Sequence, residues 1–329
     1  MRIAINGAGR IGRRLIRLLL DHPDITLVAV NDIAPLPTIA HLLQYDSIHG
    51  TWQAAVSHDS GHLLINGRSV RYTQHAALED LKWPDVDLVV ESTGKFKLRS
   101  QLQHHIKAGA KRVLLSVPPT ETDIPMLVLG INEDQIDLND AILSCASCTT
   151  NNAAPLIKIV DELCGIEQAY ITTVHSYTTD QSLHDSPHRD LRRARAAGLN
   201  TVPTTTGAAK ALTHVFPHLA GSIGGCGIRV PVALGSLTDM SINVKCDISI
   251  NAIHEAVHAF AKAQSHKIIE YSDLPLVSSD IIGSPYSCTY DSGMTSVIDR
   301  MVKLIGWYDN ESGYASRLID TMRIIWDLR

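Results

Sequence analysis

The chain lacks the features that mark several large classes of protein. Its 329 residues include only 5% aromatic residues, and 34 acidic against 29 basic side chains give a net charge of -5. No basic run interleaved with aromatic residues is present, which argues against a nucleic-acid partner. No stretch reaches the ~18 uninterrupted apolar residues of a membrane helix, and the first residues do not resemble a signal peptide. We therefore expect a soluble, cytoplasmic protein with no nucleic-acid and no membrane partner.

Cysteine is also scarce, and its spacing excludes a disulfide scaffold. The six cysteines are spread along the chain, and only Cys145 and Cys148 lie close together, as a C-x-x-C. This spacing leaves open a thioredoxin-like redox pair or half of a zinc site, although no second pair completes a metal site. A reversible Cys145–Cys148 link formed by mild oxidation is a further hypothesis.

The length and a change of pattern along the chain predict two domains. Over residues 1–147, short β-rich runs alternate with helical ones, which favours a doubly wound α/β fold. Residues 51–72 look like hairpin strands, with Asn66-Gly67 as a turn. The expected strands of this domain are Arg2–Asn6, Thr26–Asn31, Leu88–Ser92, Arg112–Ser116, Met126–Leu129 and Ala141–Ser144, and its expected helices include Ile11–Leu20 and Leu98–Ala108.

Residues 148–311 predict a second, α+β domain with a mixed or antiparallel sheet. Its polar, arginine-rich segment from Ser176 to about Thr206 is too long for an idle loop, so we expect it to be functional. Residues 312–329 are expected to form a helix that packs back on the first domain. The expected strands are Gln168–Val174, Gly227–Val232, Ser236–Lys245 and Met301–Tyr308, and the expected helices are Ala208–Phe216, Ile250–Ala263 and Gly313–Trp326.

A glycine-rich turn between the first strand and the first helix predicts a dinucleotide site. Gly7, Gly9 and Gly12 form a G-x-G-x-x-G that permits a tight turn, a close approach to a pyrophosphate and close helix packing. Asp32 ends the second strand, where a carboxylate binds both ribose hydroxyls and repels a 2′-phosphate. The first domain is therefore interpreted as a Rossmann domain with NAD as its cofactor.

Cys148 is the candidate nucleophile. A cluster of Ser, Thr and Asn surrounds it, apolar residues recur at helical spacing from Leu156 to Leu163, and Gly165 is suited to end the helix. The positive end of a helix favours a thiolate, so we expect a lowered pKa at Cys148. The simpler alternative is a buried, inert cysteine.

His175 is the candidate partner of that cysteine. It ends a strand-like run, and if it faces Cys148 it would hold the thiolate as an ion pair and move a proton during the reaction. A different class of function is suggested by His254-Glu255-Ala256-Val257-His258, the H-E-x-x-H pattern of zinc peptidases. No convincing third ligand follows this pattern, so an ordinary amphipathic helix is favoured and no metal is expected.

Sequence blocks in a fixed order along nearly the whole chain identify a resemblance. The blocks are Ile5–Gly7, Glu91–Gly94, Ser147–Asn151, His175–Thr178, Asp190–Ala197, Thr205–Lys210, Arg229–Pro231 and Trp307–Glu311. Together they resemble the phosphorylating glyceraldehyde-3-phosphate dehydrogenases of glycolysis and gluconeogenesis.

The resemblance implies a reaction of four steps. Cys148 attacks the aldehyde of D-glyceraldehyde 3-phosphate, His175 assists proton transfer, hydride passes to NAD, and inorganic phosphate releases 1,3-bisphosphoglycerate from the resulting thioester. The alternative is erythrose-4-phosphate dehydrogenase, which is non-phosphorylating because water takes the place of phosphate. A homotetramer is implied as well.

The resemblance also implies two anion sites and a set of cofactor contacts. By this analogy the substrate phosphate is framed by Thr178, Asp180 and Arg229, with Asp180 orienting an arginine, and the attacking phosphate by Ser147, Thr149, Arg193, Thr206 and Gly207. The cofactor contacts beyond Gly7, Gly9, Gly12 and Asp32 are Arg10, Ile11, Thr93, Ser116, Asn310 and Tyr314. The chain departs from the family pattern between Gln74 and Ala77, where an arginine that flanks the adenine is absent.

Overall fold

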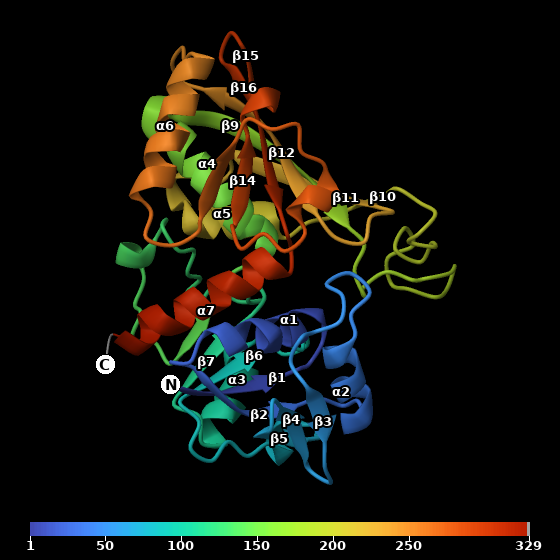
Figure 1. Ribbon diagram of the computed structural model, residues 1–329. Helices are drawn as coiled ribbons and strands as arrows, with labels where there is room; N and C mark the ends of the chain where they lie inside the picture. The colour runs from blue at the N-terminus through green and yellow to red at the C-terminus, as the bar shows by residue number, and fades with distance from the viewer. Residues whose placement is uncertain (328–329) are drawn as a thin grey trace. The chain divides into compact units, whose positions relative to one another are not determined.

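A computed structural model describes residues 1–327 of the chain (Figure 1). The chain divides into two compact units. Unit 1 contains Met1–Leu127, Glu133–Ala146 and the chain from Ala315 onward, and unit 2 contains Val128–Asn132 and Ser147–Tyr314. Among the described residues, no helix has both the length and the apolar character needed to cross a bilayer.

Unit 1 is built on an eight-stranded sheet with the order β3-β4-β5-β2-β1-β6-β7-β8. The strands from β5 to β8 in this order pair in parallel, and β3 and β4 add an antiparallel edge. The strands are β1 (Arg2–Asn6), β2 (Thr26–Asn31), β3 (Val56–His58), β4 (His62–Ile65), β5 (Arg68–Thr73), β6 (Leu88–Glu91), β7 (Arg112–Leu115) and β8 (Ile142–Ser144). The helices are α1 (Arg10–Leu18), α2 (Leu36–Gln44) and α3 (Arg99–Lys107). The expected doubly wound α/β fold is confirmed.

The sequence of unit 1 explains these elements. Ile3, Ile5 and Val90 on the central strands are fully buried, as expected for a parallel sheet covered on both faces. Asn66 and Gly67 have φ angles of 49° and 77°, the left-handed values that a two-residue hairpin turn requires, so the predicted turn is confirmed.

Two features of unit 1 differ from the sequence expectation. The strand expected over Met126–Leu129 is reduced to a single bridge between Met126 and Ser144. The Val128 carbonyl accepts from Ile131 N at 3.1 Å, so a turn begins before a ladder can extend. Helix α2 is not among the expected helices; prolines lie on both sides of its first residue, where the first helical turn tolerates them.

Unit 2 contains a second, mixed sheet with the order β10-β11-β9-β12-β16-β14-β13, and β15 pairs with β16. This confirms the expected α+β domain. The strands are β9 (Ile166–Ser176), β10 (Val202–Thr204), β11 (Ile223–Val230), β12 (Ser236–Val244), β13 (Ile269–Ser272), β14 (Cys288–Asp291), β15 (Ser296–Ile298) and β16 (Met301–Tyr308). The helices are α4 (Cys148–Cys164), α5 (Ala208–Val215) and α6 (Ile250–Ala263), and α7 (Ser312–Asp327) begins in unit 2 and continues into unit 1. The first three residues of α7 cluster with unit 2 and the rest with unit 1, and residues 328–329 of the expected terminal helix lie outside the described part of the chain.

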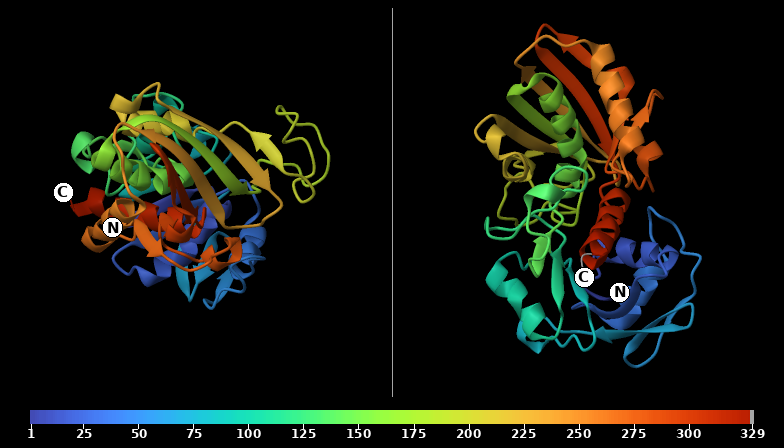
Figure 2. Two further views of the ribbon diagram at one scale, coloured as in Figure 1. Left: turned by 90° about the horizontal axis from the view of Figure 1, so that it is seen from above. Right: turned by 90° about the vertical axis from the view of Figure 1, so that its left-hand side faces the viewer.

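The arrangement of unit 2 brings chemically active residues together at one end of the sheet. Helix α4 packs against β9, β12, β14 and β16 and contacts α5 and α6. Strands β9 and β11 are parallel neighbours whose register sets Arg229 directly opposite His175. The segment 177–201 between β9 and β10 contains no helix or strand and extends beyond the β10 edge in both Figure 1 and the left view of Figure 2.

Candidate active site

The first residue of helix α4 is Cys148. Ser147 is its N-cap, with an extended backbone and a side-chain oxygen that accepts from Thr150 N at 3.1 Å. Gly165 follows the last helical residue with a φ of 65°, a left-handed value that suits glycine. The expected helix start, cap and stop are confirmed, and they place the backbone N–H groups of the first turn around the sulfur.

The structure brings Cys148 and His175 together. The Cys148 Sγ lies 3.7 Å from His175 Nε2. His175 is the penultimate residue of β9 and is buried, and its ring meets the Tyr308 ring edge-on with 5.9 Å between centroids. A nucleophile and a proton carrier within contact distance form the basic pair for covalent catalysis.

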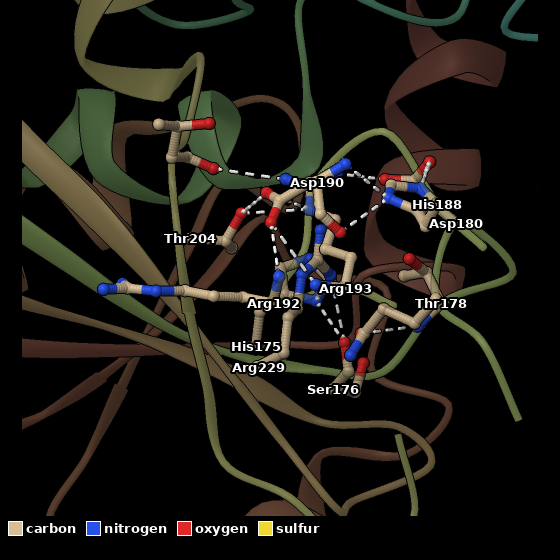
Figure 3. Close-up of polar contacts among 12 residues, drawn as sticks. His175, Ser176, Thr178, Asp180, His188, Asp190, Arg192, Arg193, Thr204 and Arg229 are labelled. Atoms are coloured by element: carbon tan, nitrogen blue, oxygen red, sulfur yellow. Dashed lines mark hydrogen bonds and ion pairs between the residues drawn. The ribbon is translucent and has the colours of Figure 1, made fainter. Parts of the chain in front are cut away.

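Arg229 lies against the imidazole of His175. Its Nη1 lies 2.6 Å from His175 Nδ1 and 3.0 Å from the Ser176 carbonyl oxygen (Figure 3). The same Nδ1 lies 2.8 Å from the Ser176 carbonyl oxygen. A guanidinium only donates and a carbonyl oxygen only accepts, so these two neighbours favour opposite tautomers of the ring. The other ring nitrogen, Nε2, faces the sulfur of Cys148.

The charge state of this pair differs from the sequence expectation. Burial, and then the charge of Arg229, lower the pKa of His175 to about 3. Burial also raises the pKa of the Cys148 thiol, while Arg229, the Thr149 hydroxyl and backbone N–H groups act in the opposite direction. The expectation of a lowered pKa at Cys148 and a thiolate–imidazolium ion pair is therefore wrong for this structure, because desolvation outweighs the contributions of these donors and of Arg229. The environment favours a thiol beside a neutral imidazole.

Arg193 organises a second cationic group next to this pair. Its Nε donates to the Thr204 hydroxyl at 2.9 Å, its Nη2 donates to the Thr205 carbonyl at 3.4 Å, and its Nη1 is paired with the Asp180 carboxylate. Figure 3 shows these contacts beside Arg229 and Thr178. The analogy assigned Asp180 and Arg193 to different anion sites, whereas the structure joins them directly.

The remaining candidate anion ligands lie at helix starts and strand ends of unit 2. The Thr149 hydroxyl contacts the Tyr308 hydroxyl at 2.9 Å. The Thr206 hydroxyl accepts from Ala208 N at 3.2 Å, and Gly207 is the N-cap of α5. Thr178 N donates weakly to Gln181 Oε1 at 3.4 Å. Tyr308 was missed from sequence, because only the fold shows that the end of β16 reaches the start of α4.

Unit 1 contains a cavity of about 200 Å³ at the carboxyl ends of its central strands. Four of the predicted cofactor residues line it, namely Gly7, Gly9, Asp32 and Thr93. Gly12, in the first turn of α1, packs against Gly7, because a Cβ at residue 12 would come within 2.1 Å of the Gly7 carbonyl oxygen. The glycine loop therefore fits a dinucleotide, since larger residues would obstruct both the close packing and the approach of a pyrophosphate.

The carboxylate of Asp32 is held by the backbone around the cavity. One oxygen accepts from Ala8 N at 2.6 Å and the other from Ala34 N at 2.9 Å. These bonds aim the carboxylate at the place where a ribose is expected.

Other predicted cofactor residues do not line this cavity. Arg10 is paired with Asp46, Ile11 is half-buried on α1, and Ser116 N donates to the Glu91 carbonyl. Asn310 and Tyr314 belong to unit 2, where the Asn310 Oδ1 accepts from the Ser176 and Ser236 hydroxyls at 3.0 and 3.1 Å.

Sequence reasoning missed a buried polar network below the cavity. The Glu91 carboxylate accepts from the Asn6 amide at 2.6 Å and from Thr93 N at 2.8 Å, and contacts His105 Nε2 at 3.0 Å. The Trp83 indole donates to His105 Nδ1, so His105 carries its proton on Nε2 and donates it to Glu91. The network holds Asn6 and Thr93, two residues of the cavity wall, in fixed positions.

The two metal hypotheses find no site. Among the described residues, no group of three or more His, Cys, Asp or Glu side chains is arranged to hold a metal ion. His258 stacks on the Tyr271 ring at 3.6 Å between centroids, and His254 packs edge-on against Tyr271 and Tyr290. The H-E-x-x-H pattern therefore belongs to an amphipathic helix packed on aromatic rings.

Cys145 does not have the environment of a reactive thiol. Its side chain is fully buried and contacts the Thr321 hydroxyl at 3.5 Å. Burial raises the pKa of Cys145 to about 11. The redox hypothesis for this residue therefore finds no support in its surroundings.

Comparison with known proteins extends over almost the entire chain. Residues 1–99 match the family described as glyceraldehyde 3-phosphate dehydrogenase, NAD binding domain, and residues 147–310 match its C-terminal domain. The chain is 46% identical over 325 residues to "Glyceraldehyde-3-phosphate dehydrogenase 2" of Streptomyces avermitilis, covering 97% of both chains. It is 45% identical over 328 residues to the protein of the same name in Bacillus subtilis, covering 98% of this chain and 96% of the relative. It is also 45% identical over 335 residues to "Glyceraldehyde-3-phosphate dehydrogenase" of Mycobacterium tuberculosis, covering 99% and 98%.

Proposed function

Because the chain belongs to the glyceraldehyde 3-phosphate dehydrogenase family, we propose that it converts D-glyceraldehyde 3-phosphate, NAD and inorganic phosphate to 1,3-bisphosphoglycerate and NADH. The observation that carries this proposal is the placement of Cys148 at the start of α4, 3.7 Å from His175 Nε2. The relatives reported above all carry the name glyceraldehyde-3-phosphate dehydrogenase, so this substrate is preferred over erythrose 4-phosphate.

The first chemical step uses the pair at the start of α4. The Cys148 sulfur adds to the aldehyde carbon, and the backbone N–H of the first helical turn donates to the oxygen that becomes negative. His175 Nε2 takes the thiol proton of Cys148 as the sulfur adds, gives it to that oxygen, and takes it back when the hydride leaves. NAD, when held by unit 1, would supply the acceptor for the hydride that leaves this carbon, and the carbon would then remain on Cys148 as a thioester. Phosphate then attacks the thioester carbon, and the sulfur leaves as thiolate.

Arg229 links substrate binding to the activation of His175. In the free protein its guanidinium occupies Nδ1 and opposes protonation of the ring. A substrate phosphate bound to Arg229 neutralises that charge and withdraws the donor from Nδ1, so the pKa of His175 rises when substrate arrives. The imidazole then becomes a competent proton carrier in the complex.

The second anion site is proposed around Arg193. Thr204, Thr205 and Asp180 hold its planar fork, and a fork of this kind suits bidentate contact with phosphate. Thr206 and the N-cap Gly207 of α5 supply a hydroxyl and a backbone donor near the same segment. Asp180 is therefore assigned an orienting role, because a carboxylate repels the phosphate itself.

The cofactor is held by unit 1. Gly7 and Gly9 leave room for the pyrophosphate at the N-terminus of α1, and Asp32 accepts from the ribose hydroxyls. The wall at His75–Ala77 takes the place of the absent adenine-flanking arginine. We propose NAD rather than NADP as the preferred cofactor, because Asp32 opposes a 2′-phosphate. The division into an NAD-binding domain and a catalytic domain follows the two units.

The proposed assembly is a homotetramer in the cytoplasm. Leu183, Leu191 and Leu199 in the segment 177–201 are 80–83% exposed. Three such leucines on one irregular segment are suited to burial against another subunit. The six free thiols fit a reducing compartment.

One assay separates the candidate functions. The rate of NAD reduction is measured with glyceraldehyde 3-phosphate and with erythrose 4-phosphate, each with and without inorganic phosphate, and is repeated with NADP. We expect fast, phosphate-dependent turnover with glyceraldehyde 3-phosphate and NAD. Phosphate-independent turnover that favours erythrose 4-phosphate would contradict the proposal.

A further inference from the structure

Two cysteines far from the active site in sequence lie opposite each other in unit 2. Cys164 ends α4, and Cys246 follows the end of β12. Val244, the last residue of β12, pairs with Ile166 of β9, so the chain just beyond β12 passes the end of α4 and Cys246 comes beside Cys164.

Backbone contacts hold these two residues side by side. Lys245 N donates to the carbonyl oxygens of Gly165 and Cys164 at 3.1 and 3.3 Å. The Cys246 thiol itself donates to the Cys164 carbonyl oxygen at 3.5 Å. Both thiols are free, and the two side chains lie close enough to influence each other's ionisation.

The two thiols differ in their access to solvent. Cys246 is exposed, whereas Cys164 is 7% exposed and donates to the Val160 carbonyl. Burial first, and then the Cys246 side chain and the Asp161 carboxylate, raise the pKa of Cys164 to about 11. An oxidant therefore meets Cys246 first, and Cys164 is placed to resolve the product.

We propose that Cys164 and Cys246 form a reversible redox site, which a small-molecule disulfide of the glutathione type converts to an intrachain disulfide. The Cys246 sulfur attacks one sulfur of the small disulfide, whose S–S bond breaks and releases one thiol that carries the proton lost by Cys246. The Cys164 sulfur then attacks the Cys246 sulfur of the mixed disulfide, and the second small thiol leaves with the Cys164 proton. The protein loses two electrons, and the small disulfide gains them as two thiols.

The bond is expected to act on stability rather than on the chemical step. It joins residues 82 positions apart, and closing so long a loop restricts the unfolded chain. Helix α4 is 17 residues long, so Cys164 lies about 25 Å along the helix from Cys148. We expect the melting temperature to rise by about 5 °C on oxidation.

The test uses the full chain equilibrated with mixtures of oxidised and reduced glutathione, quenched in acid, alkylated and mapped by mass spectrometry. We expect a Cys164–Cys246 peptide pair that disappears on addition of dithiothreitol. In Cys164→Ala, oxidation should stop at a glutathione adduct on Cys246, and in Cys246→Ser both the pair and the rise in melting temperature should be lost. Cys226→Ser should keep the pair, and Cys148→Ser should keep the pair and the shift.

Three results would overturn the proposal. One is a glutathione adduct on Cys246 of the wild-type protein that never resolves to Cys164 at any ratio. Another is oxidation of Cys164 in Cys246→Ser. The third is a bond from Cys246 to a second chain. Circular dichroism of each reduced variant checks that the substitution at the buried position leaves the fold intact.

Discussion

At the scale of single residues, the reactive sulfur is controlled by two opposed effects. Burial raises the pKa of Cys148, and Arg229 lowers it. The same arginine lowers the pKa of His175. One guanidinium therefore favours the anionic sulfur and disfavours the cationic imidazole, so the free protein holds its proton carrier neutral.

The pH dependence of kcat/KM should reflect the ionisation of Cys148 and not that of His175. The His175 pKa of about 3 lies below the assay range, so this ring stays neutral throughout it. The Cys148 pKa is raised, so the thiolate fraction grows about tenfold per pH unit until the pH reaches that raised value. We expect kcat/KM to rise with pH on the acid side, and to rise in the same way in His175→Asn at a rate lower by roughly 10²- to 10⁴-fold. An acid limb near neutral pH that disappears in His175→Asn would contradict this assignment.

Replacing Arg229 should raise the pKa of His175. In Arg229→Met the charge and the donor at Nδ1 are both lost, so the pKa of His175 should rise, as followed by NMR titration of the imidazole. The exposed neighbour Arg192→Leu is the control, because Arg192 contacts the Pro203 carbonyl and not the ring. With unphosphorylated glyceraldehyde, Arg229→Met should lose less activity than with glyceraldehyde 3-phosphate. An unchanged His175 titration would show that the arginine does not set its state.

At the scale of elements, the start of α4 combines a structural and a chemical role. Ser147 caps the helix through its side-chain oxygen, and its neighbour is the nucleophile. Helix α6 has the same kind of cap at Ser249, which accepts from Ala252 N at 3.1 Å far from Cys148 in sequence. The two caps form a matched pair for mutation.

Ser147→Ala and Ser249→Ala should each lower the free energy of unfolding by about 1 kcal/mol. Only Ser147→Ala should also reduce kcat/KM, since it loosens the turn that positions the sulfur and removes a candidate phosphate ligand. Urea unfolding and steady-state kinetics on both variants check this. Equal activity losses in the two variants would mean that the cap at Ser147 serves stability alone.

The elements also show which parts of the fold local sequence signals could predict, and why contacts between distant residues could not be predicted. The bounds of β1, β2, β16 and α6 were predicted correctly, because local signals such as apolar runs, caps and turn residues decide them. Short strands such as β10 and β15 were missed, since partners distant in sequence create them. The contact of Arg229 with His175 joins residues 54 positions apart through strand register. The register between two such strands cannot be read from the local sequence of either strand.

At the scale of the whole molecule, the exposed leucines of the segment 177–201 predict assembly. Sedimentation equilibrium should give a mass four times the 35.9 kDa of the single chain. Replacing Leu183, Leu191 and Leu199 by aspartate should shift the protein toward smaller species, because each charge would enter a subunit interface. Circular dichroism confirms that the variant chain stays folded. A tetramer that tolerates all three charges would place the interface elsewhere.

The two bonds that hold Asp32 have a consequence for cofactor engineering. Its carboxylate accepts hydrogen bonds from the backbone N–H groups of Ala8 and Ala34, so it stabilises the glycine-rich loop proposed to bind the pyrophosphate. Replacing Asp32 to make room for the 2′-phosphate of NADP also removes both of these hydrogen bonds. Redesign for NADP therefore has to supply another acceptor for Ala8 N. Without it, the affinity for both NAD and NADP should fall.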